Sequence, residues 1–458
     1  MRVVICGAGQ VGFGIAERLA AEQNDVSIID SDPHRIQMVT EQLDVRGIVG
    51  WGAHPDVLAR AGIEQADMLV AVTLHDEVNM VACQIAHALF NVPTKVARIR
   101  AQTYLAPEWS DLFSREHLAI DVVISPEIEV GEMVLRRLSL PGAIDTVSFA
   151  DGAIVAAGVI CGEDCPIINA PLQQLTDLFP DLHATIVAVS RNGRTIVPSG
   201  MEQLYVGDIA YFVTQADQVE RTLSIFGYDE VPGQRIVIAG GGNIGFYVAR
   251  ELEKRNPLAR IKLIEHDKER AQAIAEVTSR TLVLKGDALE RAILDEAGVG
   301  DADIMVALTN DDRINILSCL LSRQLGARRI LALLNEQGYA SFARGLGIEA
   351  HVNPRQITVS KVLQHVRRGR IRGVHALLDG SGELIEAEAL ETSPLVGKAL
   401  RDLNIPDGLR IGAILRDGKV LQPRGDVVMR AHDRVVLFAL AERIKRVEQL
   451  FRVALEFF

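Results

Sequence analysis

Two glycine-rich loops are the parts of this sequence whose residue types and spacing point most directly to chemistry. The first, Gly7-x-Gly9-x-x-Gly12, follows a short apolar run and precedes a helical pattern. In such a loop the first glycine permits a tight turn, the second lets the backbone approach a pyrophosphate, and the third lets helix pack on strand. The N–H groups that begin the helix then bind the phosphates. The loop therefore predicts a nucleotide site.

An acidic residue stands where such a site needs one. Asp30 closes VSIID, the next apolar run after the loop. A carboxylate there accepts hydrogen bonds from the ribose hydroxyls of adenosine and repels a 2′-phosphate. We therefore expect NAD(H), with ATP or ADP as the alternative, rather than NADP. The other interpretation of Asp30 is a turn or cap residue before Asp32-Pro33.

The same arrangement recurs in the second half, where Gly240, Gly242 and Gly245 are followed by Glu265 at the end of IKLIE. AGIEQADMLVAVTLHDEVN (61–79) aligns without a gap with AGVGDADIMVALTNDDRIN (297–315), an offset of 236 residues (297 minus 61). This period is too long for a solenoid and indicates a duplicated domain pair. We predict two nucleotide sites per chain; the alternative is that the second fold has lost binding.

Each half changes character along its length. Short β-branched runs first alternate with amphipathic helical stretches, a pattern typical of βαβ units and a parallel sheet. Hairpin patterns follow, and Asn192-Gly193 and Asp417-Gly418 suit the positive φ angles of a type I′ turn. The fold class is thus α/β, with two Rossmann-like domains that are each followed by a small α+β domain. Their predicted ranges, in chain order, are 1–136, 137–220, 233–366 and 367–458.

The composition limits the function classes. The net charge of −12 disfavours a long-range attraction to nucleic acid or anionic lipid, and 5% aromatic residues leave little for base-stacking surfaces. The five cysteines are scattered and show no metal-ligand spacing, which favours a reducing cytosol and no metal site. We see no signal peptide and no apolar run of about 18 residues, so any membrane involvement is expected through a partner.

Longer stretches resemble a known family. HPDVLARAGIEQADMLVAVTLHDEVNMVACQIA (54–86), GAGQVG before it and VARIR (96–100) after it resemble the TrkA family, as do GGGNIG, KLIEHD and ALTNDDRINILSC in the second half. The resemblance covers essentially the whole chain. It implies tandem RCK (regulator of potassium conductance) units, each a TrkA-N and a TrkA-C domain. It also implies a cytoplasmic subunit, peripheral to the inner face of the cell membrane, that gates a potassium-uptake protein of TrkH or TrkG type.

The resemblance further implies assembly as a homo-oligomer, a tetramer forming a ring of eight RCK units. The family's binding positions can be carried over to this sequence. In the first half they are Gly7, Ala8, Gly9, Gln10, Val11, Gly12, Asp30, Thr73, Leu74 and Arg98. In the second half they are Gly240, Gly241, Gly242, Asn243, Ile244, Gly245, Glu265, Thr309 and Asn310. The alternative for Arg98 is a solvent-facing arginine at the end of a strand.

The halves also differ. The second half has Gly286-Asp287 after its third strand where the first has Gly50-Trp51, and Ala332 stands opposite Arg98. We therefore expect the two sites to differ in affinity or in preferred nucleotide. The first residues of the following helix, among them Asp76, Glu77 and Asn79 with their counterparts Asp312, Arg313 and Asn315, are interpreted as helix caps, with a ligand or interface contact as the alternative.

No grouping of residue types in the sequence has the spacing of a catalytic site. An NAD-dependent oxidoreductase would need a substrate domain with an acid–base group near the nicotinamide. Here only a small domain follows the first Rossmann-like unit before a second unit begins. We therefore expect a regulatory protein and not an enzyme. The alternatives are such an oxidoreductase, or a nucleotide-sensing module that regulates another cation transporter.

Overall fold

The computed structural model describes residues 1–140, 142–174, 179, 182–229, 233–348, 350–366, 371–377 and 380–451. The chain forms two compact units. Unit 1 comprises Met1–Val130 and Pro354–Val366, and unit 2 comprises Gly131–Asn353 and Arg367–Phe458. The predicted boundary at residue 367 lies outside the described residues. Within the described part, none of the helices has both the length and the hydropathy needed to cross a membrane.

Unit 1 contains a six-stranded parallel sheet in the order β3-β2-β1-β4-β5-β6. Its strands are β1 (Arg2–Cys6), β2 (Asp25–Asp30), β3 (Arg46–Val49), β4 (Met68–Ala71), β5 (Thr94–Arg98) and β6 (Val122–Ile124). The strand order reverses between β1 and β4, and ligands of open α/β sheets bind in the crevice at such a point, outside the carboxyl ends of the strands. The predicted Rossmann-like fold is confirmed, and the first glycine loop follows β1 at this crevice.

Apolar side chains on both faces of this sheet explain its helical layers. Val3 and Ile5 of β1 belong to one buried cluster, and Val4 and Cys6 belong to another. Helices cover both clusters because a parallel sheet that is apolar on both faces must be buried on both. They are α1 (Gln10–Ala21), α2 (Pro33–Gln42), α3 (Pro55–Arg60) and α4 (Asp76–Ala88).

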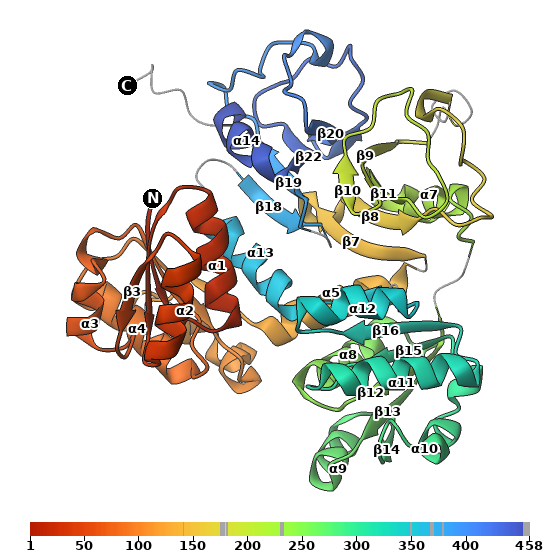
Figure 1. The fold of residues 1–458 in the computed structure, drawn as a ribbon, viewed down its shortest axis with the longest axis horizontal. Coiled ribbons are helices and arrows are strands. Elements are labelled where there is room, and N and C mark those ends of the chain that lie inside the picture. Colours follow the sequence, from red (N-terminus) through yellow and green to blue (C-terminus); the bar gives the residue numbers. More distant parts are fainter. Residues whose placement is uncertain are drawn as a thin grey trace. The chain divides into compact units, whose positions relative to one another are not determined.

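One helix of unit 1 comes from far along the chain. α13 (Pro354–Val366) follows the second Rossmann-like sheet in the sequence, but it packs against α1. Val362 and Leu363 of α13 share a buried cluster with Ile15 and Leu19 of α1, and Figure 1 shows the two helices side by side. The sequence analysis had assigned these residues only to the range 233–366, so this partner was not anticipated.

A matching contact occurs in unit 2. α5 (Pro126–Ser139) follows the first sheet, and its second part packs against α8 (Asn243–Arg255). Glu132 of α5 accepts a hydrogen bond from the Tyr247 hydroxyl at 2.7 Å and pairs with Arg255 at 2.5 Å. In each half of the chain, the helix that follows the parallel sheet therefore packs against a helix of the other half.

Unit 2 holds a second six-stranded parallel sheet in the order β14-β13-β12-β15-β16-β17, the same topology as the first. Its strands are β12 (Arg235–Ala239), β13 (Arg260–Glu265), β14 (Leu282–Lys285), β15 (Ile304–Ala307), β16 (Arg329–Leu333) and β17 (Ala350–Val352). Besides α8, the helices around it are α9 (Lys268–Val277), α10 (Arg291–Glu296), α11 (Asp312–Leu325) and α12 (Gln337–Gly345).

The small domains are two antiparallel sheets in the orders β10-β9-β11-β8-β7 and β18-β19-β22-β20-β21. The first contains β7 (Ala143–Phe149), β8 (Ile154–Ile160), β9 (Ala184–Arg191), β10 (Arg194–Ile196) and β11 (Ile209–Gln215), with α7 (Val219–Ile225). The second contains β18 (Ile371–Ala376), β19 (Gly382–Glu388), β20 (Leu409–Arg416), β21 (Lys419–Leu421) and β22 (Arg434–Leu440), with α14 (Ile444–Leu450). They share a core in which Tyr211 and Val213 pack with Leu384 and Phe438.

Both predicted hairpin turns are present between neighbouring strands. Asn192 and Gly193 join β9 to β10 with φ angles of 51° and 75°, and Asp417 and Gly418 join β20 to β21 with φ angles of 48° and 76°. Positive φ at both central residues is the requirement of a type I′ turn, and asparagine, aspartate and glycine meet it at low cost.

Candidate nucleotide-binding site

The first glycine loop has the backbone geometry that its sequence predicts. Gly7 has a φ of +108°, and a Cβ at Gly12 would overlap the carbonyl oxygen of Gly7, so α1 approaches β1 more closely than any side chain permits. A Cβ at Gly9 would meet nothing nearer than the Arg35 guanidinium at 3.9 Å. Gly9 therefore leaves open space at the start of α1, where a phosphate would lie.

The first turn of α1 carries neither a capping side chain nor an acidic residue in the described part of the chain. Gly9 is the N-cap of this helix. α2, by contrast, is capped by the Asp32 side chain, which accepts a hydrogen bond from the His34 N–H at 2.9 Å. Because the first N–H groups of a helix need acceptors and carry partial positive charge, the start of α1 fits a pyrophosphate.

Asp30 reaches back over this loop from the end of β2. One carboxylate oxygen accepts the Ala8 N–H at 2.7 Å and the other accepts the Asp32 N–H at 2.9 Å. A carboxylate has about four acceptor positions, so room remains for ribose hydroxyls. The cap of α2 is Asp32 and not Asp30, so the interpretation of Asp30 as a helix cap is not supported. The hydrogen bond that Asp30 accepts from the N–H two residues on is that of a turn, so the alternative interpretation as a turn residue fits.

The second loop repeats these contacts. Gly240 has a φ of +101°, a Cβ at Gly245 would overlap the Gly240 carbonyl oxygen, and Gly242 opens α8 with no side-chain cap from the described residues. Glu265 accepts the Gly241 N–H at 2.7 Å and the Asp267 N–H at 2.9 Å. The longer glutamate side chain thus reaches the same place as Asp30, and the residues present fit a nucleotide phosphate and ribose here as well.

The loops after β4 and β5 are joined by a buried asparagine. Asn79, which is fully buried, accepts hydrogen bonds from the Thr73 N–H at 2.9 Å and the Thr73 hydroxyl at 2.7 Å, and donates to the Arg98 carbonyl oxygen at 2.9 Å. Asn315 does the same with Thr309 and the Leu333 carbonyl oxygen. The interpretation of these asparagines as helix caps is wrong, because their side chains hold two strand ends together.

Asp76 has a related role that the sequence analysis missed. Its carboxylate accepts the N–H groups of Arg100, at 3.0 and 2.9 Å, and of Ala101 at 2.8 Å, while the N-cap of α4 is His75. Asp312 likewise accepts the N–H groups of Asn335 and Glu336, each within 3.0 Å. The repeated D-x-x-N spacing in both halves was the available signal, but the strand-end partners lie about twenty residues away.

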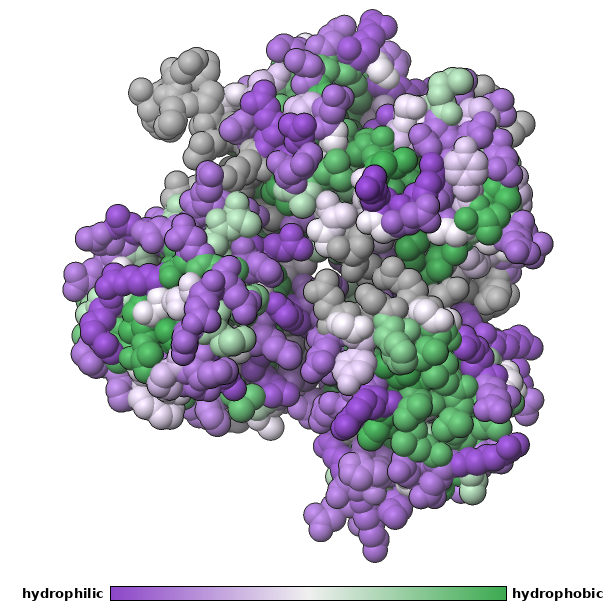
Figure 2. Space-filling view, viewed as in Figure 1, coloured by the Kyte–Doolittle hydropathy of each residue, from purple (hydrophilic) through white to green (hydrophobic). Residues whose placement is uncertain are grey.

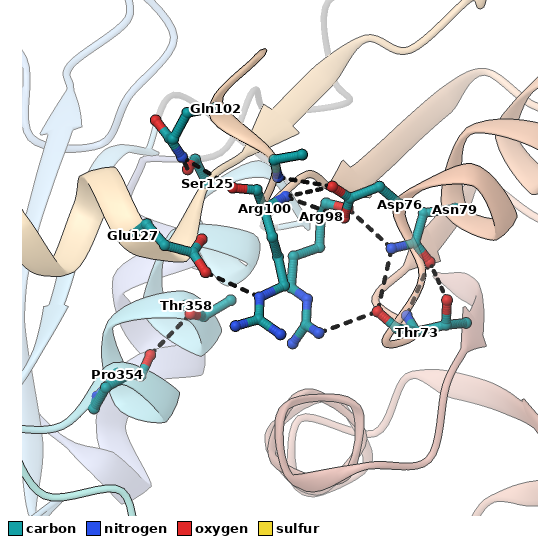
Figure 3. Close-up of polar contacts among 11 residues, drawn as sticks. Thr73, Asp76, Asn79, Arg98, Arg100, Gln102, Ser125, Glu127, Pro354 and Thr358 are labelled. Atoms are coloured by element: carbon teal, nitrogen blue, oxygen red, sulfur yellow. Dashed lines mark hydrogen bonds and ion pairs between the residues drawn. The ribbon is translucent and has the colours of Figure 1, made fainter. Parts of the chain in front are cut away.

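Arg98 is half-buried at the carboxyl end of β5. Its guanidinium donates to the Thr73 carbonyl oxygen at 3.1 Å, and its buried Nε has no hydrogen-bond partner in the described part of the chain. Figure 3 shows the guanidinium groups of Arg98 and Arg100 next to each other. Burial, and then the charge of Arg100, lower the pKa of Arg98 from its ordinary value. Arg100 pairs with Glu127 at 2.9 Å, which leaves Arg98 as the cation suited to an anionic ligand.

The predicted residues thus gather at two crevices. Thr73 and the exposed Leu74 follow β4 beside the first glycine loop, and Thr309 and the exposed Asn310 follow β15 beside the second. The structure corrects the predicted counterpart of Arg98. The Leu333 carbonyl oxygen accepts from Asn315 as the Arg98 carbonyl oxygen accepts from Asn79, so Leu333 takes the place of Arg98, and Ala332 matches Ala97. Leu333 is buried and uncharged, so the second crevice lacks a cation at this position.

A cavity of about 470 Å³ occupies a different part of unit 2, between the two small domains. Apolar residues of both domains line it, together with Arg401, Arg410 and Arg424 from the second. The predicted nucleotide-binding residues are not among its lining residues. This cavity therefore belongs to the small domains and is separate from the candidate nucleotide sites.

Comparison with known proteins identifies the family. The TrkA-N domain model matches residues 3–126 and 236–354, and the TrkA-C domain model matches residues 157–227 and 384–452. The Trk system potassium uptake protein TrkA of Azorhizobium caulinodans is 75% identical over 458 residues, which is 100% of both chains. The chain belongs to the TrkA family. The TrkA of Halomonas elongata is 40% identical over 462 residues, again 100% of both chains.

Solved structures agree with the fold of this TrkA-family chain. The GsuK RCK domain aligns with a TM-score of 0.61 at 19% identity, covering 98% of this chain and 94% of that one. A GsuK channel bound to NAD aligns with a TM-score of 0.61 at 18% identity, covering 98% of this chain and 78% of that one. The predicted fold is therefore confirmed, with two TrkA-N domains that are each followed by a TrkA-C domain.

Proposed function

We propose that this TrkA-family chain is a regulatory subunit that binds NAD(H), or ATP and ADP, at both glycine loops and thereby gates a potassium-uptake protein of TrkH or TrkG type. One observation carries the proposal. In each half, an uncapped helix begins at an open glycine, and an acidic side chain from the end of the next strand lies over the loop. This arrangement supports binding of a phosphate and a ribose at the same place.

The bound nucleotide acts as a signal in this proposal. The nucleotide would contact the glycine loop, the acidic residue and the strand ends held by Asn79 or Asn315, and would thereby favour one conformation of the site. A ligand shifts an equilibrium only by its differential affinity for the two states, typically about 1–3 kcal/mol of coupling per site. Two sites per chain, multiplied in an oligomer, would give enough coupling to move a membrane partner between closed and open states.

The proposal places the chain in the cytoplasm, at the inner face of the cell membrane through its partner, as a tetramer with eight RCK units. A large apolar surface supports contacts between copies. Figure 2 shows a hydrophobic area over α11, where Leu317 is 49% exposed, and Phe342 of the neighbouring α12 is 60% exposed. Contiguous apolar surface of this kind marks interaction sites in proteins.

Calorimetric titration of the purified protein with NADH, NAD⁺, ATP and ADP, together with a redox turnover assay, tests the proposal. Saturable binding near two ligands per chain without turnover is the expected result. Reconstitution with a TrkH-type protein should then show nucleotide-dependent potassium flux. Turnover with an added hydride acceptor would favour an oxidoreductase instead, and nucleotide binding without an effect on flux would favour regulation of another cation transporter.

The two acidic residues give a sharper test of the sites. Asp30→Ala and Glu265→Ala should each weaken nucleotide binding at one site by roughly 10- to 100-fold, because each removes a charged acceptor of ribose hydroxyls. The matched control is Asp25→Ala, at the opposite end of β2, where the carboxylate is exposed and pairs with the exposed Arg2. Calorimetry on the three variants measures the effect. Unchanged affinity in both site variants would refute the ribose assignment.

A further inference from the structure

Trp51 is a large aromatic side chain left in solvent at the edge of the first crevice. It follows β3 directly after Gly50, and it is 55% exposed. The Gly50 N–H donates to the Asp30 carbonyl oxygen at 2.9 Å, so the backbone entering Trp51 lies beside the residue proposed to bind the ribose. Exposed tryptophan costs solvation free energy, and a large apolar side chain at a ligand crevice is explained when a ligand covers it.

A second exposed apolar side chain lies at the same sheet edge. Leu74 follows Thr73 after β4 and is 68% exposed. Both residues therefore lie in loops at the carboxyl ends of the strands, where ligands of this fold bind. A ribose held by Asp30 carries its base on the neighbouring ring carbon, so the base lies within the space that these loops border. Trp51 and Leu74 are therefore the exposed apolar side chains in the loops that border the space for the base.

The second crevice presents polar groups at the same positions. The Gly286 N–H donates to the Glu265 carbonyl oxygen at 2.9 Å, which is the hydrogen bond that Gly50 makes to Asp30. Asp287 therefore takes the place of Trp51, and Asn310 takes the place of Leu74; both are exposed. The Asp287 carboxylate accepts the Leu289 N–H at 2.9 Å and keeps further acceptor positions.

From this contrast we infer that Trp51 stacks on the base of a purine nucleotide in the first site, whereas Asp287 accepts a hydrogen bond from the exocyclic amine of adenine in the second. The inference rests on the proposed nucleotide binding. Stacking tolerates changes at the rim of the base because every base has a π face. The Asp287 carboxylate, by contrast, needs the hydrogen-bond donor that the exocyclic amine of adenine supplies. The first site therefore accepts adenine and hypoxanthine nucleotides alike, and the second discriminates between them.

The test uses ADP, which carries the adenosine and pyrophosphate that NAD(H) and ATP share, and IDP, in which a carbonyl replaces the amine. The chain has two tryptophans, so Trp109→Phe leaves Trp51 as the only one. In that background, Glu265→Ala isolates the first site. We expect ADP and IDP to quench Trp51 fluorescence saturably and with similar affinity. Calorimetry measures the Trp51 variants, which carry no tryptophan in this background. Adding Trp51→Asp should weaken ADP binding by roughly 10-fold or more, within the range of one lost base stack, while Trp51→Phe should retain it.

The reciprocal arm isolates the second site with Asp30→Ala, where calorimetry should find ADP bound about 10-fold more tightly than IDP, the discrimination typical of one hydrogen bond. Asp287→Ala should remove that preference. Trp109→Asp is the control for the first arm, because Trp109 is likewise a large exposed side chain, at 61%, and lies in the 3₁₀ segment Pro107–Phe113 outside the proposed base site. If wild-type protein binds ADP but adding Trp51→Asp in the Glu265→Ala background leaves the ADP affinity unchanged, the inference alone fails. If wild-type protein binds neither ADP nor IDP, the proposed function fails with it.

Discussion

Gly12→Ala is expected to abolish nucleotide binding at the first site and to destabilise the surrounding domain. The new methyl group would overlap the Gly7 carbonyl oxygen, which is backbone and cannot turn aside. α1 must then move away from β1, at a cost of about 3 kcal/mol. A loss of this size corresponds to a fall in Tm of roughly 6–12 °C for a domain of 150–250 residues. Thermal unfolding and calorimetric titration measure the two effects.

Gly9→Ala is the matched control, since it adds the same methyl group three residues earlier. Its Cβ would contact only the end of the flexible Arg35 side chain at 3.9 Å, so stability should stay within about 1 kcal/mol. Nucleotide binding should still fall, because the methyl group would occupy the space proposed for the phosphate. Full binding by Gly9→Ala would show that the pyrophosphate lies elsewhere. Gly245→Ala and Gly242→Ala repeat the comparison in the second half, where a Cβ at Gly242 meets nothing within 4 Å.

Asn79→Ala is expected to have a similarly large effect through a different cause. The substitution leaves the Thr73 N–H and the Arg98 carbonyl oxygen without the partners that the buried amide supplies. Buried polar groups without partners cost about 1–3 kcal/mol each, so we expect a loss of about 3 kcal/mol in the free energy of unfolding. Urea denaturation followed by circular dichroism measures it.

The same substitution should loosen the crevice, because the loops after β4 and β5 are no longer joined. We expect weaker nucleotide binding at the first site together with the loss of stability. Glu77→Ala, on an exposed position of the same helix, controls for the change in helix propensity and should stay within about 0.5 kcal/mol of wild type. Wild-type stability in Asn79→Ala would contradict the assignment of this amide as a structural clamp.

Much of the candidate site was predictable because its requirements are local. Gly7 needs a positive φ, Gly12 needs the absence of a side chain, and each stands at a fixed spacing in one short loop. The type I′ turns at Asn192-Gly193 and Asp417-Gly418 follow from the same kind of local preference. Asp30 and Glu265 were predictable because each closes a strand pattern, and parallel strands place their carboxyl ends at one edge.

The side chains of Asp76 and Asn79, which join the loops after β4 and β5, were not predictable from local patterns. Asp76 and Asn79 stand at the start of a helix, where acidic and amide side chains ordinarily cap or face solvent. Their actual partners are backbone groups at Arg98, Arg100 and Ala101, on a strand end that only the sheet brings near. The partial burial of Arg98 has the same origin, since its guanidinium reaches across to the Thr73 carbonyl oxygen in the loop after β4.

The sequence by itself thus determined the duplication, the alternation of strands and helices, the glycine loops and their acidic residues, because period, φ preference and spacing are properties of neighbouring residues. Only the tertiary structure decided which segments meet. α13 packs on α1 of the other half, where Val362 and Leu363 join Ile15 and Leu19 in one core. The apolar face of an amphipathic helix can be buried by any complementary apolar surface. The sequence of the helix therefore predicts that this face is buried, but it does not predict which surface covers it.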